Sequence, residues 1–134
     1  MSIDKLKFHT DDADSPEQAA AHMAIFLEWA AERGHLAGHH DVEKLRADPV
    51  KYVVEESPNI AESDFTDEGY AFAAEGYGEF LEYLGEHASD ADLSSYEYAA
   101  TPGARALMHE CLDEALEEFN ELRGERETPS RREP

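Results

Sequence analysis

The sequence has a single cysteine, Cys111, and no long run of apolar residues. One thiol excludes an internal disulfide and any metal site built from several cysteines, which fits a reducing compartment. A membrane-spanning helix needs about 20 apolar residues in succession, and the first residues, Met1 to Lys5, lack the apolar stretch of a signal peptide. We therefore expect a cytoplasmic protein that does not enter a membrane.

Basic residues are also scarce, since 11 Lys and Arg stand against 32 Asp and Glu and give a formal net charge of -21. Proteins bind nucleic acid largely through Lys and Arg that displace counterions from phosphates. Direct binding to nucleic acid is therefore disfavoured, as is binding to anionic membrane surfaces. The stretch from Tyr52 to Ala104 contains no Lys or Arg at all, so the negative charge is concentrated in one part of the chain.

The 134 residues suffice for one domain, and 41% of them are apolar, which is enough for a core. The clearest helix begins after Ser15, which can cap it, with Pro16 in the first turn, and ends near Gly34. Apolar residues occupy most of its circumference, so we expect this helix at the centre of the fold.

Caps and apolar spacing predict four more helices. Two short ones cover Asp41 to Ala47 and Asp48 to Ser57. Two long ones run from Thr66 to about Glu86 and from Thr101, as cap, to Leu122, with a stop at Gly124. The predicted fold class is all-α: a compact bundle of three long amphipathic helices with short connecting helices.

The two ends of the chain differ from this helical body. Residues 125–134 contain no apolar residue to bury, so we expect a disordered tail after a single acidic helical domain over residues 1–124. Near the start, apolar and polar residues alternate between Ile3 and Phe8, which fits either a short edge strand or an extended arm.

Five glutamates on the second long helix follow one another at spacings of 7, 4, 3 and 4 residues and share one face. We call them the acidic ridge: Glu68, Glu75, Glu79, Glu82 and Glu86. Phe72 and Tyr83 lie beside the ridge, where we expect them to be exposed. Exposed aromatic residues among acids are typical of an anchor site for a basic protein. These seven residues are the predicted partner-binding site, unless the ridge is only the solvated face of a salt-adapted protein and a neighbouring segment covers Phe72.

The same helix carries four glycines, each of which costs up to about 1 kcal/mol relative to alanine in a helix interior. They are Gly69, Gly76, Gly78 and Gly85. This pattern predicts close approach of neighbouring backbones, with a break of the helix near Gly76 as the alternative.

His35, His39 and His40 gather near Glu32 and Asp41, and imidazole with carboxylate suits Zn, Fe or Ni. A metal-dependent enzyme that uses this cluster is therefore an alternative, although a polar surface loop is the simpler interpretation. No nucleophile elbow, phosphate-binding loop or dinucleotide motif is present. We accordingly assign no catalytic residue, no metal ligand and no cofactor.

The runs HMAIFLEWA (22–30), GHL (34–36), VEKLR (42–46) and TDEGYAF (66–72) resemble a family of small acidic bacterial proteins without an assigned function. The likeness covers roughly residues 15–85. It implies a shared fold and transfers no catalytic residue, because the matching positions are core residues and caps.

The sequence thus favours a non-catalytic acidic protein that binds and occludes a basic partner. Our leading hypothesis is a bacterial immunity protein that neutralises a cognate toxin. A toxin that acts on nucleic acid has a cationic cleft, where the acidic ridge would take the place of phosphates. The alternatives are the metal-dependent enzyme with His35, His39 and His40, and a salt-adapted protein whose acidity serves no partner.

Overall fold

The computed structural model describes residues 2–127, and most of them are helical. The α-helices are α1 (Pro16–Glu32), α2 (Val42–Ala47), α3 (Pro49–Glu56), α4 (Asp67–Asp90), α5 (Ser95–Ala99) and α6 (Ala104–Glu127). The remaining elements are strands β1 (Ser2–Lys5) and β2 (Asn59–Ala61) and the 3-10 helices η1 (Leu6–Phe8) and η2 (Glu62–Asp64). The predominantly α-helical character that the sequence predicts is confirmed.

Side-chain caps determine where five of the helices begin. The residues Ser15, Asp41, Asp48, Thr66 and Ser94 each accept a hydrogen bond from the backbone N–H three residues further on. These bonds satisfy N–H groups that have no partner inside the first turn of a helix. The predicted starts of α1 to α4 are therefore confirmed.

The start of the last helix differs from the prediction. The Thr101 side chain does not cap α6, which begins at Ala104. Its hydroxyl instead donates to the carbonyl oxygen of Tyr98 at 2.7 Å, at the end of α5. No apolar periodicity in the sequence predicts α5, because a five-residue helix is too short to show a periodic apolar face.

The end of the last helix also differs, because α6 runs through Gly124 and ends at Glu127. Gly124 was expected to stop the helix, but a glycine only weakens a helix and does not exclude one. The first three residues of the predicted tail, 125–127, are thus helical, and the rest, 128–134, lies outside the described residues.

The N-terminal segment forms a strand, one of the two outcomes left open by its alternating sequence. β1 pairs with β2 in antiparallel fashion, with Asp4 opposite Ile60 and Lys5 opposite Asn59. The register is irregular between Ser2 and Asp4, and such a bulge redirects a strand's side chains. The Asp4 side chain is buried.

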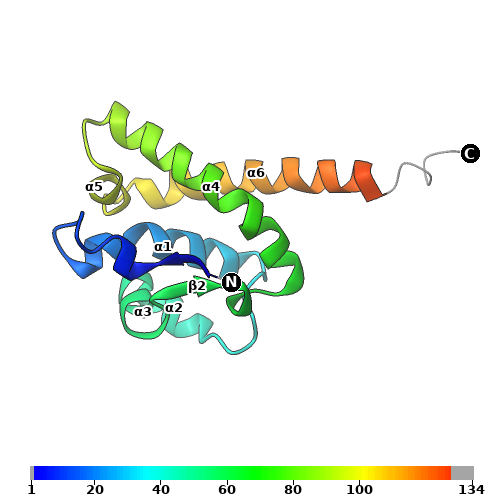
Figure 1. Cartoon of the computed structure of the whole chain (residues 1–134), viewed down its shortest axis with the longest axis horizontal. Helices are drawn as coiled ribbons and strands as arrows, with labels where there is room; N and C mark the ends of the chain where they lie inside the picture. Colours follow the sequence, from blue (N-terminus) through cyan, green and yellow to red (C-terminus); the bar gives the residue numbers. More distant parts are fainter. Residues whose placement is uncertain (1, 128–134) are drawn as a thin grey trace, which may run out of the picture.

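The central position of α1 is confirmed, since every residue from Ala19 to Ala30 is buried. Figure 1 shows α1 in the middle layer, with α2, α3 and β2 on one side and α4, α5 and α6 on the other. Aromatic contacts join α1 to α4, because the ring of Phe26 lies 4.9 Å from that of Tyr77 and 5.6 Å from that of Phe80. Within residues 2–127, no helix has both the length and the apolar character that crossing a bilayer requires.

Helix α4 is continuous from Asp67 to Asp90, so the alternative of a break near Gly76 is wrong. A side chain at Gly69 would overlap the backbone carbonyl of His35, which confirms a close backbone approach there. At Gly76 the close neighbour is the ring of Phe72 in the same helix, and at Gly78 no atom lies within 4 Å.

Candidate functional site

The acidic ridge lies on α4 as its spacing predicts, and its five glutamates are all exposed. Among the described side chains, none of the five takes part in an ion pair. Like charges at helical spacing repel one another by a few tenths of a kcal/mol per pair, and α4 contains no Lys or Arg to relieve this.

Phe72 does not lie on the surface, so its predicted exposure is wrong. Only 2% of the residue is exposed, because its ring is held between Trp29 of α1, at a centroid distance of 5.3 Å, and Phe119 of α6, at 5.5 Å. The possibility that a neighbouring segment covers Phe72 is confirmed, and that segment is α6. Tyr83, the second predicted aromatic, is half-buried against the core.

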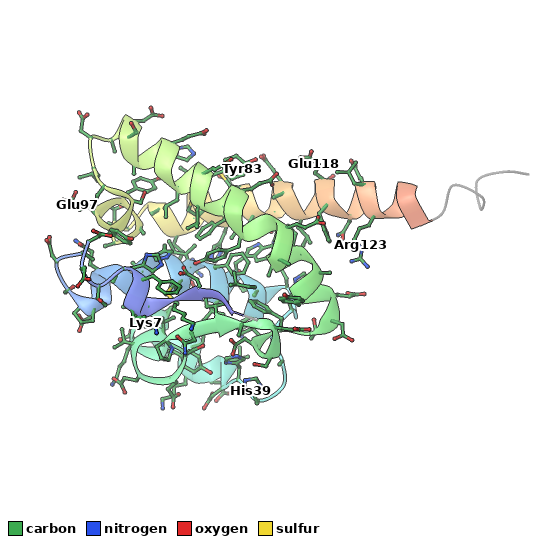
Figure 2. The ribbon with its side chains drawn as sticks, in the orientation of Figure 1. Lys7, His39, Tyr83, Glu97, Glu118 and Arg123 are labelled. Atoms are coloured by element: carbon green, nitrogen blue, oxygen red, sulfur yellow. The ribbon has the colours of Figure 1, made fainter. Side chains whose placement is uncertain are left out.

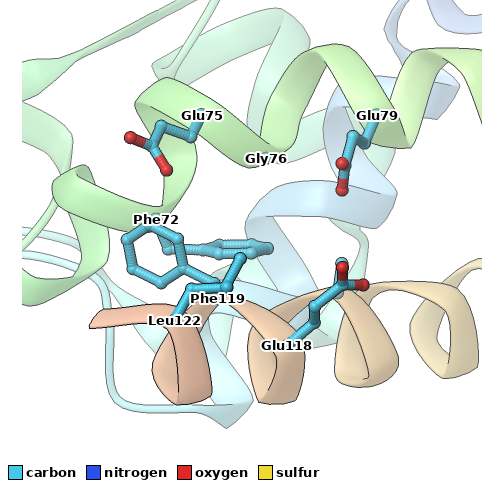
Figure 3. A pocket seen from close by; sticks show the side chains of 8 residues that line it. Phe72, Glu75, Gly76, Glu79, Glu118, Phe119 and Leu122 are labelled. Atoms are coloured by element: carbon cyan, nitrogen blue, oxygen red, sulfur yellow. The ribbon is translucent and has the colours of Figure 1, made fainter. Parts of the chain in front are cut away.

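A small acidic groove opens where α4 and α6 pack together, with a volume of about 90 Å³. Glu75 and Glu79 line it from α4 and Glu118 lines it from α6, above the rings of Phe72 and Phe119. In Figure 3 the carboxylates of Glu79 and Glu118 face each other across the groove. The helix crossing thus brings two ridge glutamates together with a third carboxylate that the ridge prediction did not include.

The electrostatics of neighbouring groups show how negative this side of the protein is. Burial raises the pKa of the Tyr83 hydroxyl, and the nearby carboxylates of Glu79 and Glu118 raise it further. Burial likewise raises the pKa of the Cys111 thiol, with Glu114 adding to the effect. Each of these groups becomes harder to ionise because a new negative charge would lie among carboxylates. A cation at the same place would be stabilised.

Phe119, one of the aromatic residues that line the groove, is already in contact with a cation of the same helix. The guanidinium of Arg123 lies over the ring of Phe119, 5.4 Å from its centroid, which is within the range of a cation–π interaction. The ring of Phe119 can therefore accept a guanidinium group.

A larger hollow of about 460 Å³ lies between α1, α3 and the start of α6. Its walls are mainly small apolar side chains, and its charged groups are Glu28 and Arg105 together with the exposed Glu17. The guanidinium of Arg105 pairs with the carboxylate of Glu28. No unpaired buried charge is left at this hollow to recognise a ligand, so we do not regard it as the site.

The histidine cluster suggested by the sequence does not form as a group. His35 stands apart with its ring against Trp29, at a centroid distance of 5.9 Å, and burial lowers its pKa. Glu32 accepts a hydrogen bond from Arg105, and Asp41 caps α2. These residues are close in the sequence but do not form one cluster, because the turn after α1 separates their side chains.

His39 and His40 instead meet Asp64 of η2. The Nε2 atom of His40 lies 2.9 Å from Oδ1 of Asp64, and that of His39 lies 3.8 Å from the same oxygen. Burial would raise the pKa of Asp64, but the hydrogen bonds from His40 and from the backbone N–H of Ala61 outweigh it and lower the pKa. Figure 2 shows His39 on the opposite side of the molecule from Tyr83 and Glu118.

A second cluster of titratable groups surrounds Asp4, and the sequence analysis did not find it. The Oδ1 atom of Asp4 lies 2.6 Å from Nε2 of His9, and its Oδ2 atom lies 3.1 Å from Nε2 of His22 and accepts from the hydroxyl of Tyr77. Burial would raise the pKa of Asp4, but the hydrogen bonds from His22, Tyr77 and His9 outweigh it and lower the pKa to about 2.

The one sequence signal for this cluster was a carboxylate within the alternating segment at the start of the chain. An acidic residue at an inward-facing strand position must find partners in the core.

Comparison of the chain with protein-family models, with curated proteins and with solved structures finds no match. These comparisons therefore indicate no family and no function.

Proposed function

We propose that this chain is a non-catalytic binding protein that occludes a basic partner protein. One observation carries the proposal: Glu75, Glu79 and Glu118 line one small groove with the rings of Phe72 and Phe119, Glu79 and Glu118 face each other across it (Figure 3), and among the side chains that the structure describes none of the three has an ion-pair partner. Carboxylates gathered in this way repel one another in the free protein. A cationic side chain of a partner would remove that repulsion.

The groove suits an arginine better than a lysine. A guanidinium can donate two parallel hydrogen bonds to a carboxylate and can also stack on an aromatic ring. The carboxylates of Glu79 and Glu118 and the ring of Phe119 offer both kinds of contact within one small groove. Exposed ion pairs alone contribute at most about 1 kcal/mol each, so we assign the anchoring role to the groove and a steering role to the rest of the ridge.

The proposed partner is a toxin that acts on nucleic acid, which would make the chain an immunity protein of the bacterial cytoplasm. The ridge from Glu68 to Glu86 spans about 27 Å at 1.5 Å per residue. It carries five charges, whereas one DNA strand of that length carries about eight at 3.4 Å each. The ridge thus carries fewer negative charges per unit length than a DNA strand, and a cleft that binds phosphates would accept it.

Affinity capture from the source cells tests the proposal. The tagged chain is used at low salt and at about 0.5 M salt, where the screening length falls to about 4 Å. We expect near-stoichiometric recovery of one basic protein at low salt and its release at high salt.

A pair of matched variants shows whether the groove is the contact. The first combines Glu75→Gln, Glu79→Gln and Glu118→Gln. The control combines Glu43→Gln, Glu55→Gln and Glu62→Gln, which are exposed positions on α2, α3 and η2 and change the net charge equally. Loss of the partner with the groove variant alone supports the proposal, whereas equal recovery with both variants contradicts it.

Co-expression then tests the immunity role. If the captured protein is a toxin, cells that express it survive with the wild-type chain and with the control variant but not with the groove variant. Normal growth of cells that express the captured protein alone would exclude a toxin, while the binding role would stand.

A further inference from the structure

A buried carboxylate and two imidazoles meet on the side of α1 that faces β1. Asp4 comes from β1, His9 follows η1, and His22 lies in the middle of α1. One potential ligand atom from each of the three lies within 4.8 Å of the others. Asp4 and His22 are buried and His9 is half-buried.

We propose that Asp4, His9 and His22 bind one divalent transition-metal ion, of the class that prefers imidazole and carboxylate ligands, such as Zn²⁺, Co²⁺, Ni²⁺ or Fe²⁺. Ligand atoms around a tetrahedral ion at bond lengths of about 2.0–2.1 Å are about 3.3 Å apart. The separations here are 2.6 Å for Asp4 to His9 and 3.1 Å for Asp4 to His22. The first distance is to Oδ1 of Asp4 and the second to Oδ2, and each of these two pairs needs to move apart by less than about 1 Å to reach that spacing.

Outer-shell hydrogen bonds hold two of the three ligands in place. The Nδ1 atom of His9 lies 2.7 Å from the hydroxyl of Tyr96, and Oδ2 of Asp4 accepts from the hydroxyl of Tyr77. A histidine that ligates a metal usually donates its other ring N–H to such a partner, which orients the ring. The Tyr96 contact thus keeps Nε2 of His9 directed at the carboxylate.

The third ligand, His22, has an unsatisfied atom. Its Nδ1 is buried without a hydrogen-bond partner in the described part of the chain, which costs about 1–3 kcal/mol for a group of this kind. The hydrogen bond between Nε2 of His22 and Asp4 therefore leaves the other ring nitrogen of His22 unsatisfied. Nε2 is the nitrogen of His22 that points at the Asp4 carboxylate, so Nε2 is the atom that would ligate the ion.

A hollow of about 370 Å³ lies beside the cluster, bordered by His9 and His22 and by Asp12, Ser94 and Tyr96. It offers a route for the ion and room for a water or a small ligand at an open coordination position. The carboxylate of Asp12 and the overall negative charge of the protein raise the local concentration of cations there.

The cluster of His39, His40 and Asp64 also places three ligand atoms within 4.8 Å, but it is less suited to hold an ion. The His39 side chain is 60% exposed, and its nearest ring nitrogen is 3.8 Å from the Asp64 carboxylate. An exposed and loosely placed ligand must lose more conformational freedom on binding. We therefore assign the tighter site to Asp4, His9 and His22.

Titration of the full chain with Co²⁺ tests this assignment, because the visible absorption of Co²⁺ reports its coordination. The reference protein carries His39→Ala, which removes the weaker cluster. We expect it to bind one Co²⁺ per chain. Adding His9→Ala should weaken that binding by more than about 100-fold, and Tyr96→Phe, which keeps all three ligands, should weaken it by about 10–100-fold.

The control is His87→Ala in the same background, because the His87 ring stacks on Tyr98 rather than on the cluster. This control should bind Co²⁺ like the reference, and circular dichroism confirms that each variant is folded. If the reference takes up no Co²⁺, or if His9→Ala leaves its affinity unchanged, the cluster is only a hydrogen-bonded part of the fold. The proposed metal site shares no residue with the acidic groove, so neither result bears on the basic partner.

Discussion

The Oδ1 atom of Asp113 on α6 lies 2.9 Å from Nε1 of Trp29 on α1, where it accepts the hydrogen bond of the buried indole. The guanidinium of Arg33 pairs with the same carboxylate oxygen. Asp113 thereby fastens α6 to the central helix. This contact helps to set where α6 crosses α4, and hence where Glu118 faces Glu79 across the acidic groove.

Replacing Asp113 by alanine should cost about 1–3 kcal/mol in the free energy of unfolding. Trp29 is only 1% exposed, and its indole N–H would lose its hydrogen-bond acceptor. Asp113→Asn keeps an acceptor and should cost less, and the exposed neighbour Glu114→Ala should cost little. Urea unfolding measures all three variants. Equal losses for Asp113→Ala and Glu114→Ala would contradict the role of this contact.

The same carboxylate should make stability depend on pH. Burial would raise the pKa of Asp113, but the hydrogen bonds from Arg33 and Trp29 outweigh it and lower the pKa below the ordinary 3.8. The ionised form thus stabilises the folded state above pH 3.8, and this contribution is lost as the pH falls below that value. The difference in unfolding free energy between wild type and Asp113→Asn should therefore be largest near pH 6 and shrink toward pH 2.5. A difference that stays constant over this range would contradict the assignment.

Local features of the fold could be predicted from the sequence. Ser15, Asp41, Asp48 and Thr66 cap helices through contacts within three residues, so the sequence alone contains the necessary information. The apolar circumference of α1 likewise indicated a helix buried on all sides. The acidic ridge needed only the helical period of α4.

Features that depend on which helix crosses which could not be predicted. Leu81 falls on the apolar face of α4 by helical spacing, yet it is 38% exposed. Phe72 was expected on the surface, but α6 buries it. Leu122 falls on the apolar face of α6 by helical spacing, yet it is 49% exposed. The bond from Tyr77 to Asp4 joins residues 73 positions apart, a separation at which no local pattern carries a signal.

Two glycines of α4 should respond to alanine in opposite directions. At Gly69 a side chain would overlap the His35 carbonyl, and forcing an atom into a packed interior costs about 1–3 kcal/mol. At Gly78 no atom lies within 4 Å, so alanine should stabilise α4 by up to about 1 kcal/mol. Thermal unfolding of Gly69→Ala and Gly78→Ala measures both effects. Similar melting temperatures for the two variants would contradict the close approach at Gly69.

The groove glutamates of α4 should lower the stability of the free protein, because their like charges lie close together on one helix. Glu75 and Glu79 are four residues apart, and like charges at that spacing cost about 0.2–0.5 kcal/mol. The double variant Glu75→Gln with Glu79→Gln should therefore be more stable than wild type at low salt, and the gain should shrink at 0.5 M salt. Melting temperatures at both salt concentrations test this.

The salt-adapted alternative predicts a different outcome in the same measurement. A chain whose acidity is only an adaptation to salt should unfold at low ionic strength and recover in molar salt. The groove glutamates would then have no special effect compared with Glu43 and Glu55.

The most direct test of the acidic groove is the affinity for the captured basic partner, measured by calorimetry at low salt. We compare the wild type, the groove variant with Gln at 75, 79 and 118, and the control variant with Gln at 43, 55 and 62. We expect the groove variant to bind at least about tenfold more weakly, a loss of about 1.4 kcal/mol, and the control to stay within about twofold of wild type. Equal affinities of the groove and control variants would show that the partner does not bind in the groove.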